Sequence, residues 1–458
     1  MGFDSVELSD VLTEKGYIRG PFGSALKRGE MKDSGIPVYE QNHAIYGERE
    51  FRYFIDQEKF EDLNRFQVQE DDLIISCSGT VGEISIIDKS DPKGIISQAL
   101  LILRVDTERM LPHFLRYFFT SRTGRYLLLG ASHGSVQNNI AKKSIVTSIP
   151  IPLPSLEIQN EIVDQLYTID QKIHLNEQTN ETLEKIAQAI FKSWFVDFDP
   201  VRAKIEAASA DRDPNRAAMA AIVGVTIEQD WDAIEAALQQ KLDRMSDEQR
   251  TQLRQIAELF PDELVESEIG MVPKGWEYST IGKEFDIVNG QSPPGSSYNE
   301  EGEGSPFYQG RTDFGFRFPT QRVYCTEPKR FAKKGDTLLS VRAPVGDLNI
   351  AIEDCCIGRG IASLRHKSGS VSYTYYAMKQ VQAQIEAYEA TGTVFGSINQ
   401  KQLKALDTIA PDRKVINEFH RIADPIDSKV MNQAFMNREL SKLRDTLLPK
   451  LISGEVGV

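Results

Sequence analysis

Apolar residues recur at alternating spacings of three and four along two long segments of the chain. The first segment places them at Ile162, Leu166, Ile169, Ile173, Leu183, Ala187, Ile190 and Trp194. The second repeats this seam 257 residues later, at Ala423, Ile426, Val430, Leu440, Arg444, Leu447 and Leu451. Such spacing is typical of a coiled coil. It predicts two helices of about 40 residues, each about 60 Å long.

Both seams are interrupted by amide side chains near their middle. Asn176 and Asn180 interrupt the first, and Gln433 and Asn437 stand at the matching positions of the second. If the helices pack antiparallel, the two amide pairs meet in a buried layer that costs stability but fixes register. The alternative is that these amides face solvent on a kinked helix.

The rest of the chain consists of short apolar runs separated by Gly, Pro and Asn. This pattern predicts strands at residues 73–75, 84–87, 100–105, 338–341 and 348–352, and main helices at residues 111–129 and 373–388. We therefore expect mixed α and β domains with many loops.

Four short strings recur in the same order. Those at Gly35, Asp72, Thr80 and Gly134 return at Gly304, Asp336, Pro344 and Gly392. The order predicts a duplicated domain, because separate chance matches would not keep it. The expected fold class is α+β: two similar mixed domains separated by two long helices that form an antiparallel coiled coil about a pseudo-twofold axis.

The 458 residues divide into four expected parts. They are a first domain at 1–154, a central region at 155–267, a second domain at 268–410 and a distal helix at 411–458. The central region combines a long helix at 155–195 with a helical insertion at about 205–258.

The formal net charge of −14 is unevenly distributed. Residues 155–267 carry 11 basic and 23 acidic groups, whereas residues 268–410 carry 16 of each. Residues 1–154 carry 18 basic and 21 acidic groups. The two domains are therefore close to neutral, which permits a local basic face on each.

Three strings carry a family resemblance. Residues 191–204 (FKSWFVDFDPVRAK), residues 259–276 with Gly270-Met-Val-Pro-Lys-Gly-Trp276, and residues 443–456 (LRDTLLPKLISGEV) resemble conserved regions of the specificity (S) subunits of type I restriction–modification systems. Two departures stand out. The N-terminal segment lacks the Pro-x-Gly-Trp motif of the second domain, and residues 205–258 look like an added helical hairpin.

The resemblance implies a role and partners. Each domain of such a subunit reads half of a bipartite, asymmetric site on double-stranded DNA, and the helices set the unread gap. Two methyltransferase (M) subunits dock on the helices, and restriction (R) subunits join for cleavage. The resemblance implies that this chain binds no cofactor itself, with S-adenosylmethionine in the M subunits and ATP and Mg²⁺ in the R subunits. Separately, no apolar run is long enough to span a bilayer, and the acidic, polar segment Met1 to Lys15 is unlike a signal or transit peptide, so we expect a cytoplasmic protein.

Catalytic motifs are not found in the sequence. It has no Asn/Asp-Pro-Pro-Tyr/Phe methyltransferase string, no phosphate-binding GxxxxGK[ST] loop and no metal-ligand set. The four cysteines, in no CxxC pair, are expected to be buried thiols. We therefore expect a non-catalytic subunit. The alternatives are a coiled-coil scaffold with two protein-binding domains and a DNA-modifying enzyme with an unrecognised site.

Base reading in the major groove uses Arg or Lys for guanine, Asn or Gln for adenine, and Ser or Thr for either. Loops near glycines supply such side chains in both domains. The first-domain candidates are Arg19, Ser24, Lys27, Gln41, Asn42, His43, Ser78, Thr80, His133, Ser135, Gln137 and Asn138. The second-domain candidates are Gln291, Ser292, Gln309, Arg311, Thr312, Arg342, Arg359, Ser397 and Asn399.

The two copies of the repeat differ in the loops that are expected to contact DNA bases. Gln41-Asn42 aligns with Gly310-Arg311, and Ser78 aligns with Arg342, whereas Gly82 and Gly346 agree. A constant frame with exchanged polar tips suits two readers of different half-sites. The alternative for any single residue is an ordinary surface loop.

Overall fold

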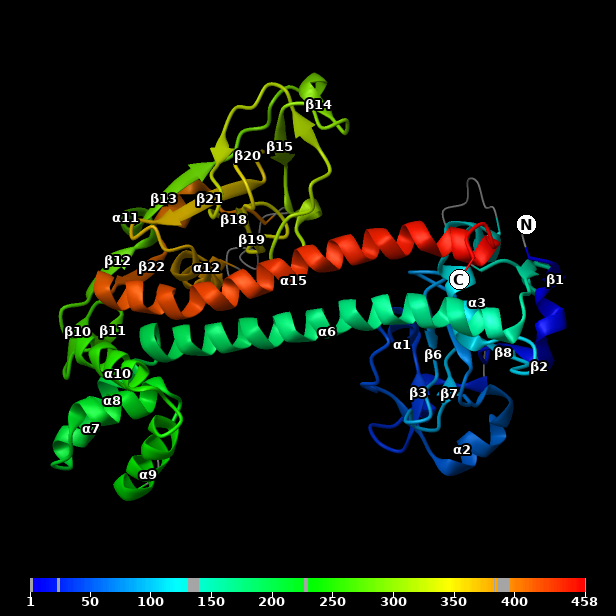
Figure 1. Cartoon of the computed structure of the whole chain (residues 1–458), viewed down its shortest axis with the longest axis horizontal. Coiled ribbons are helices and arrows are strands. Elements are labelled where there is room, and N and C mark those ends of the chain that lie inside the picture. Colours follow the sequence, from blue (N-terminus) through cyan, green and yellow to red (C-terminus); the bar gives the residue numbers. More distant parts are fainter. Residues whose placement is uncertain are drawn as a thin grey trace. The chain divides into compact units, whose positions relative to one another are not determined.

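The computed structural model describes residues 3–22, 25–130, 140–225, 230–382, 384–385 and 396–457, apart from the side chain of Arg28. The chain forms two compact units. Unit 1 comprises Met1–Leu175 and Met436–Val458, and unit 2 comprises Asn176–Phe435. Each unit contains one globular domain together with part of each long helix (Figure 1).

The main sheet of each globular domain has four antiparallel strands in the same order. In unit 1 the order is β2 (Leu12–Arg19), β8 (Leu100–Val105), β5 (Leu73–Ser76) and β6 (Ile84–Ile86). In unit 2 it is β13 (Phe285–Asn289), β21 (Ile361–His366), β18 (Thr337–Ser340) and β19 (Leu348–Ile350). This shared topology confirms the predicted duplication.

A second sheet in each domain contains one parallel strand pair. In unit 1, β3 (Ile36–Tyr39) pairs with β7 (Ile95–Ile96) and with β4 (Phe54–Ile55). In unit 2, β15 (Ser305–Tyr308) pairs with β20 (Cys355–Ile357) and with β16 (Tyr324–Cys325). Unit 2 adds β14 (Tyr298–Asn299) and β17 (Phe331–Ala332) to this sheet. In each domain, a two-stranded antiparallel sheet pairs an early strand with a late one. The pairs are β1 (Ser5–Glu7) with β9 (Pro150–Pro152), and β12 (Glu277–Thr280) with β22 (Asp407–Ala410).

The expected helix at 111–129 is two helices, α3 (Pro112–Thr120) and α4 (Arg122–Leu129). The chain leaves the helical region at Ser121, whose φ of −64° and ψ of 156° are extended. The Ser121 hydroxyl accepts a hydrogen bond from the Gly124 amide at 3.1 Å, so the serine starts the second helix as its N-cap. The counterpart in unit 2 is α12 (Val371–Gln380), which begins two residues before the expected start.

Shorter helices complete the domains. They are α1 (Gln41–Tyr46), α2 (Gln57–Asp62), α5 (Lys143–Thr147), α11 (Ile281–Glu284) and α14 (Gln400–Lys404).

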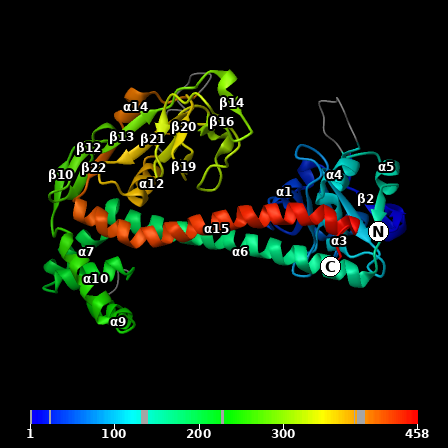
Figure 2. The same ribbon diagram turned by 45° about the horizontal axis from the view of Figure 1, so that its top comes forward.

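The long helices are α6 (Leu156–Phe195) and α15 (Arg413–Ser453), and they run antiparallel within each unit (Figures 1 and 2). In unit 1, Ile162 and Leu166 of α6 share an apolar cluster with Leu448 and Leu451 of α15. In unit 2, Phe191 of α6 packs edge-to-face on Phe419 of α15 with ring centroids 5.5 Å apart. This confirms the predicted antiparallel seam.

The amides of the seam face the partner helix: Asn176 and Asn180 are buried, and Gln433 and Asn437 are half-buried. Asn176 and Asn180 are 1% and 3% exposed. In unit 2, Gln433 Nε2 donates to Asn176 Oδ1 at 3.4 Å. In unit 1, Asn437 Nδ2 donates to the Ile173 carbonyl at 3.2 Å. The buried layer, and not the kinked alternative, is the arrangement adopted.

The helical insertion of unit 2 contains α7 (Asp199–Ser209), α8 (Pro214–Ile222), α9 (Trp231–Leu242) and α10 (Asp247–Leu259). Its apolar cluster includes Ala218, Ile234, Leu238 and Leu253. The hairpin β10 (Leu264–Ser267) and β11 (Gly270–Pro273) then leads into the second domain. Among the described residues, no helix is both long and apolar enough to cross a bilayer.

Candidate nucleic-acid interface

The loops that follow β2, β3 and β5 meet at one edge of the first domain. Both β2 and β5 run antiparallel to β8, so both end beside its start, where Arg19 pairs with Leu101 and Ser76 with Leu100. Gln41, which follows β3, joins this edge because its Nε2 donates to the carbonyls of Ser78 and Thr80, the latter at 3.2 Å. We call this surface the first strand-end edge.

Two cavities flank Arg19 at this edge. One, of about 450 Å³, is lined by Arg19, Phe22, Ser78, Ser97 and Gln98 among others. The other, of about 360 Å³, is lined by Tyr17, Arg19, Arg65, Ile140, Ala141, Lys142 and Lys143. We call the second the basic hollow, since four of its seven lining residues are cationic and none is acidic.

Arg65, Lys142 and Lys143 of the basic hollow are exposed and were not among the candidates predicted from the sequence. They are distant from Arg19 in the chain, so only the fold brings them together. In the sequence, the consecutive residues Lys142 and Lys143 are the feature that indicates a basic site. Lys143 also places its ammonium 5.3 Å from the centre of the Tyr17 ring.

The second domain gathers its candidate loops around the turn at 358–360. The Gln291 amide donates to the Ile357 carbonyl at 3.0 Å, and the Gly360 amide donates to the Gln309 carbonyl at 3.1 Å. The Arg359 amide donates to the Ser292 hydroxyl at 3.3 Å. These contacts define the second strand-end edge.

The glycines on either side of Arg359 permit this close approach. A Cβ on Gly360 would lie 2.5 Å from the Gln309 carbonyl oxygen, and one on Gly358 would lie 2.9 Å from the Gln309 Cα. Arg359 itself is exposed. The turn thus presents one guanidinium on a backbone that is held against the neighbouring loop.

Four further candidates lie at the second edge. Arg342 and Ser397 are both exposed and form an isolated β-bridge, which joins the loop after β18 to the segment before α14. Arg311 and its neighbour Thr312 are exposed, and Arg311 pairs with Asp347 at 2.6 Å. A pair this exposed contributes little to stability, so Arg311 can exchange partners at low cost.

Some candidates are occupied within the fold. His43 is fully buried, accepts a hydrogen bond from the Glu40 amide at 2.7 Å and stacks on Phe51 with centroids 4.6 Å apart. Asn399 caps α14 by accepting from the Gln402 amide at 3.0 Å. These two residues therefore serve the scaffold, and we leave them out of the proposed contact set.

The remaining candidates divide by position. Asn42 is half-buried at the start of α1, and Lys27 is exposed with its amide donating to Glu30 at 2.8 Å. Five lie outside the described residues: Ser24, His133, Ser135, Gln137 and Asn138.

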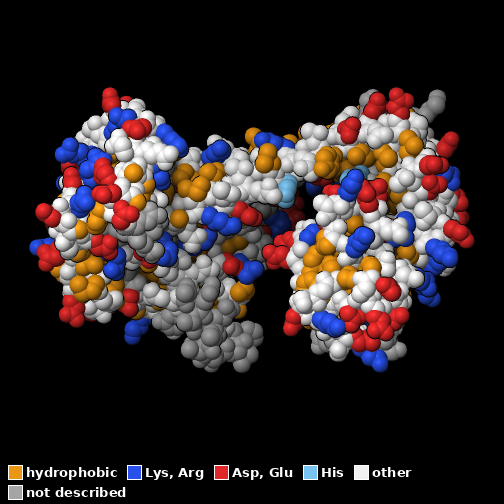
Figure 3. Space-filling view, turned by 90° about the horizontal axis from the view of Figure 1, so that it is seen from below, with side chains coloured by type: hydrophobic (Ala, Val, Ile, Leu, Met, Phe, Trp, Pro, Cys, Tyr) orange, Lys and Arg blue, Asp and Glu red, His pale blue; other side chains and the backbone are white. Residues whose placement is uncertain are grey.

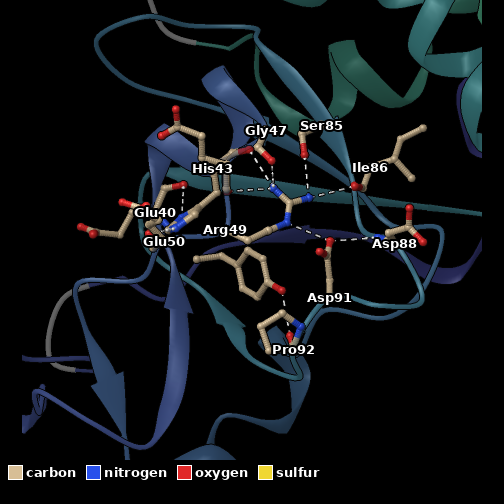
Figure 4. A network of polar contacts seen from close by, with 12 residues as sticks. Glu40, His43, Gly47, Arg49, Glu50, Ser85, Ile86, Asp88, Asp91 and Pro92 are labelled. Carbon is tan, nitrogen blue, oxygen red and sulfur yellow. Dashed lines mark hydrogen bonds and ion pairs between the residues drawn. The ribbon is translucent and has the colours of Figure 1, made fainter. Parts of the chain in front are cut away.

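Arg49, which was not among the candidates predicted from the sequence, holds α1 in place (Figure 4). Arg49 pairs with Asp91 at 2.8 Å and donates to the Ser85 hydroxyl and the Ile86 carbonyl at 3.1 and 3.0 Å. It also donates to the Gly47 carbonyl at 3.1 Å, just after α1. The network fixes the helix whose first residues, Gln41 and Asn42, belong to the first edge.

The frame beneath the two edges is the same. Arg104 pairs with Asp72 at 2.7 Å, and Arg365 pairs with Asp336 at 2.6 Å. Burial raises the pKa of Asp72, although the Arg104 partner opposes the rise. The turns after β5 and β18 contain Gly82 and Gly346 at φ of 83° and 104°. Equivalent strands thus end in different side chains on a common support.

The cysteines are free and buried, as expected. Burial raises the pKa of the Cys77 and Cys355 thiols to about 12, so neither is a thiolate at neutral pH. Within the described ranges, no group of His, Cys, Asp and Glu is arranged to hold a metal ion.

On the face drawn in Figure 3, acidic and basic side chains are interspersed.

The chain is similar in sequence to known proteins of one family. The sequence model of the type I restriction modification DNA specificity domain matches residues 3–185 and 273–429. The type I restriction enzyme HindI specificity subunit of Haemophilus influenzae is 29% identical over 395 residues, which cover 82% of this chain and 84% of that protein. The putative type I restriction enzyme MjaX specificity subunit of Methanocaldococcus jannaschii is 25% identical over 412 residues, covering 88% of this chain and 83% of that protein.

A solved structure shares the fold. The S subunit of a type I restriction–modification system from M. genitalium aligns with a TM-score of 0.54 and 15% identity, over 98% of this chain and 96% of that one. The family model covers both copies of the duplicated domain and most of the chain. The protein therefore belongs to the type I restriction modification DNA specificity domain family and is a specificity (S) subunit.

Proposed function

We propose that this chain reads DNA for a type I restriction–modification complex without catalysing a reaction. Each strand-end edge reads one half of a bipartite, asymmetric site. The observation that carries this proposal is one frame presenting two different sets of tips: Ser78 in the first domain stands where Arg342 stands in the second. Identical tips would read a symmetric site.

The tips suit different bases. Arg342, Arg359 and Arg311 at the second edge carry the fork geometry that pairs with guanine O6 and N7. Asn42 at the first edge carries an amide, which pairs with adenine N6 and N7. The Gln41 amide nitrogen already donates to the Ser78 and Thr80 carbonyls. We therefore expect the second half-site to be richer in guanine than the first.

Replacing Arg342 by alanine is expected to relax the half-site of the second domain alone. The loss of one bidentate base contact costs about 1–3 kcal/mol of discrimination. The measurement is the methylation frequency at every single-base variant of both half-sites. Arg254, 70% exposed in its side chain on α10, supplies the matched control Arg254→Ala. Equal weakening of both half-sites would assign Arg342 to a phosphate or to the scaffold.

The basic hollow is expected to bind the DNA backbone rather than bases. Each phosphate contact contributes about 0.9 to the slope of log K against log salt concentration. The double variant Lys142→Ala/Lys143→Ala should therefore reduce the slope by about 1.8 and weaken binding to all sequences alike. A salt titration of the assembled complex measures this slope.

The matched control lies at the opposite end of the strands of the main sheet. Lys89 and Lys93 are exposed in the loop between β6 and β7, and β6 ends beside the start of β5, away from the strand-end edge. Lys89→Ala/Lys93→Ala should leave the slope unchanged. A loss confined to one half-site sequence in the Lys142/Lys143 variant would contradict a phosphate role.

The long helices are the proposed docking site for two M subunits. Tyr167 on α6 and Leu443 on α15 are 44% and 48% exposed in unit 1, and Ile186 on α6 is 45% exposed in unit 2. These exposed apolar side chains are available for contact with a partner. S-adenosylmethionine would then be bound by the M subunits, and ATP with Mg²⁺ by R subunits that join them.

The experiment that tests the function is co-expression of the chain with its cognate methyltransferase subunit, followed by mapping of methylated sites. A bipartite motif with a fixed gap and two different half-sites supports the proposal. Unmodified DNA would favour a coiled-coil scaffold with two protein-binding domains. A single continuous motif would overturn the assignment of one half-site to each domain.

A further inference from the structure

The same tyrosine–aspartate contact occurs in both units. Tyr117 is the sixth residue of α3 and Tyr376 the sixth of α12, while Asp170 and Asp427 are the fifteenth residues of α6 and α15. The Tyr117 hydroxyl donates to Asp170 Oδ2 at 2.9 Å. The Tyr376 hydroxyl donates to Asp427 Oδ1 at 3.1 Å. In each unit, this hydrogen bond thus joins the globular domain to a long helix.

The chemistry of both contacts is that of a neutral donor and a charged acceptor. Burial, reinforced by the neighbouring aspartate, raises the pKa of both tyrosine hydroxyls. Each hydroxyl therefore keeps its proton at physiological pH. A hydrogen bond to a carboxylate is roughly twice as strong as one between neutral groups.

Other polar attachments differ between the units. Asp170 also pairs with Arg444 of α15 at 3.0 Å and, more loosely, with Arg116 of α3 at 3.9 Å. Asp427 pairs instead with Arg317 of the second domain at 2.8 Å, from a position that does not match Arg116. Gln159 of α6 accepts from the Leu111 amide at 2.8 Å in unit 1, and the position 257 residues later is Ile416. Among the residues that the structure describes, the tyrosine–aspartate contact is the domain-to-helix hydrogen bond found at matching positions of both units.

We propose that Tyr117–Asp170 and Tyr376–Asp427, here called the latches, set the angle of each globular domain on the long helices and thereby restrict the gap that the subunit accepts between half-sites. This inference rests on the proposed function. One added base pair moves a half-site by about 3.4 Å and turns it by about 35°. A domain must pivot to follow that movement, and a latch resists the pivot.

Phenylalanine variants remove the tyrosine hydroxyl and keep the ring. At Tyr376 the change also removes the 3.2 Å hydrogen bond that Arg317 donates to that hydroxyl. The rings of Tyr117 and Tyr376 belong to the apolar clusters that join the domains to the helices, so they stay packed without the hydroxyl. Each aspartate keeps its arginine. Tyr117→Phe and Tyr376→Phe are therefore expected to fold, and each tests positioning rather than assembly.

The experiment measures methylation of a site library in which the gap varies by one base pair on either side of the wild-type length. Losing a charge-assisted hydrogen bond shifts an equilibrium roughly tenfold or more. Each single variant should therefore raise methylation at altered gaps, relative to the wild-type gap, roughly tenfold, with a larger rise in the double variant. The preferred half-site sequences should not change.

Tyr126→Phe is the control, because Tyr126 on α4 is 54% exposed and should keep the wild-type gap preference. The latch inference fails alone if the wild type shows a bipartite motif while the Tyr117→Phe and Tyr376→Phe variants keep its gap preference. It also fails if they lose methylation equally at every gap, since that outcome indicates general destabilisation. If the wild type methylates no bipartite site, the proposed function fails with it.

Discussion

Inserting four residues into each long helix at the amide layer is expected to lengthen the gap between half-sites by about one to two base pairs. The insertions belong beside Asn176 in α6 and beside Gln433 in α15, because these two amides contact each other. Both half-site sequences should remain as in the wild type. The measurement is the methylation motif of cells that express the lengthened chain with its partner subunits.

The size of the effect follows from helix and DNA geometry. Four residues advance a helix by about 6 Å and turn it about 40° beyond a full turn. One base pair advances DNA by about 3.4 Å and turns it about 35°. The insertion therefore changes distance and angle in the same sense as one to two added base pairs. A four-residue step also unwinds a coiled coil only locally.

The matched control places the four residues in α6 alone. The antiparallel partners beyond the insertion then lose register, which separates Ile162 and Leu166 from Leu448 and Leu451. This variant should lose methylation at all gaps. If the doubly lengthened chain instead methylates at the original gap, the helices do not set the spacing.

Replacing Arg317 by alanine is expected to destabilise unit 2 by about 3–5 kcal/mol. Its side chain is 0% exposed and donates to Asp427 at 2.8 Å, and its guanidinium carbon lies 4.3 Å from the centre of the Tyr375 ring. Alanine leaves the largely buried Asp427 carboxylate without its cationic partner. Chemical denaturation of the full chain, followed by tryptophan fluorescence, measures the change, because Trp194, Trp231 and Trp276 all belong to unit 2.

Two comparisons sharpen this result. Arg254→Ala removes an exposed pair with Glu258 and should cost no more than about 0.5 kcal/mol. The double variant Arg317→Met/Asp427→Leu should recover part of the loss, because apolar pairs often replace buried ion pairs without penalty. A single variant that is as stable as the wild type would mean that the Asp427 charge is solvated without Arg317.

The long helices and the duplication could be predicted from the sequence because each leaves a periodic record. A seam that repeats at 257 residues fixes both the helix type and the matching positions of Asn176 and Gln433. Local exceptions leave no such record. Ser121 breaks an otherwise continuous helical pattern through its own backbone conformation, and neighbouring apolar residues give no sign of it.

The strand-end edges were predictable only in part. Gln41, Ser78 and Arg342 lie where aligned strands end, so the repeat located them. His43 has a side chain that could contact DNA, but it lies in the core. Its ring stacks on Phe51 and accepts a hydrogen bond from the Glu40 amide. Arg317 and the basic hollow depend on residues far apart in the chain, which no local pattern connects.

The division of the chain into units also bears on the order of folding during synthesis. Unit 2, Asn176–Phe435, is one continuous stretch and can complete its contacts as it leaves the ribosome. Unit 1 needs Met436–Val458, so Ile162 and Leu166 must wait for Leu448, Leu451 and Ile452 to emerge. An apolar stripe that waits this long is open to aggregation. We therefore expect the nascent first domain to be more exposed to aggregation during synthesis than unit 2.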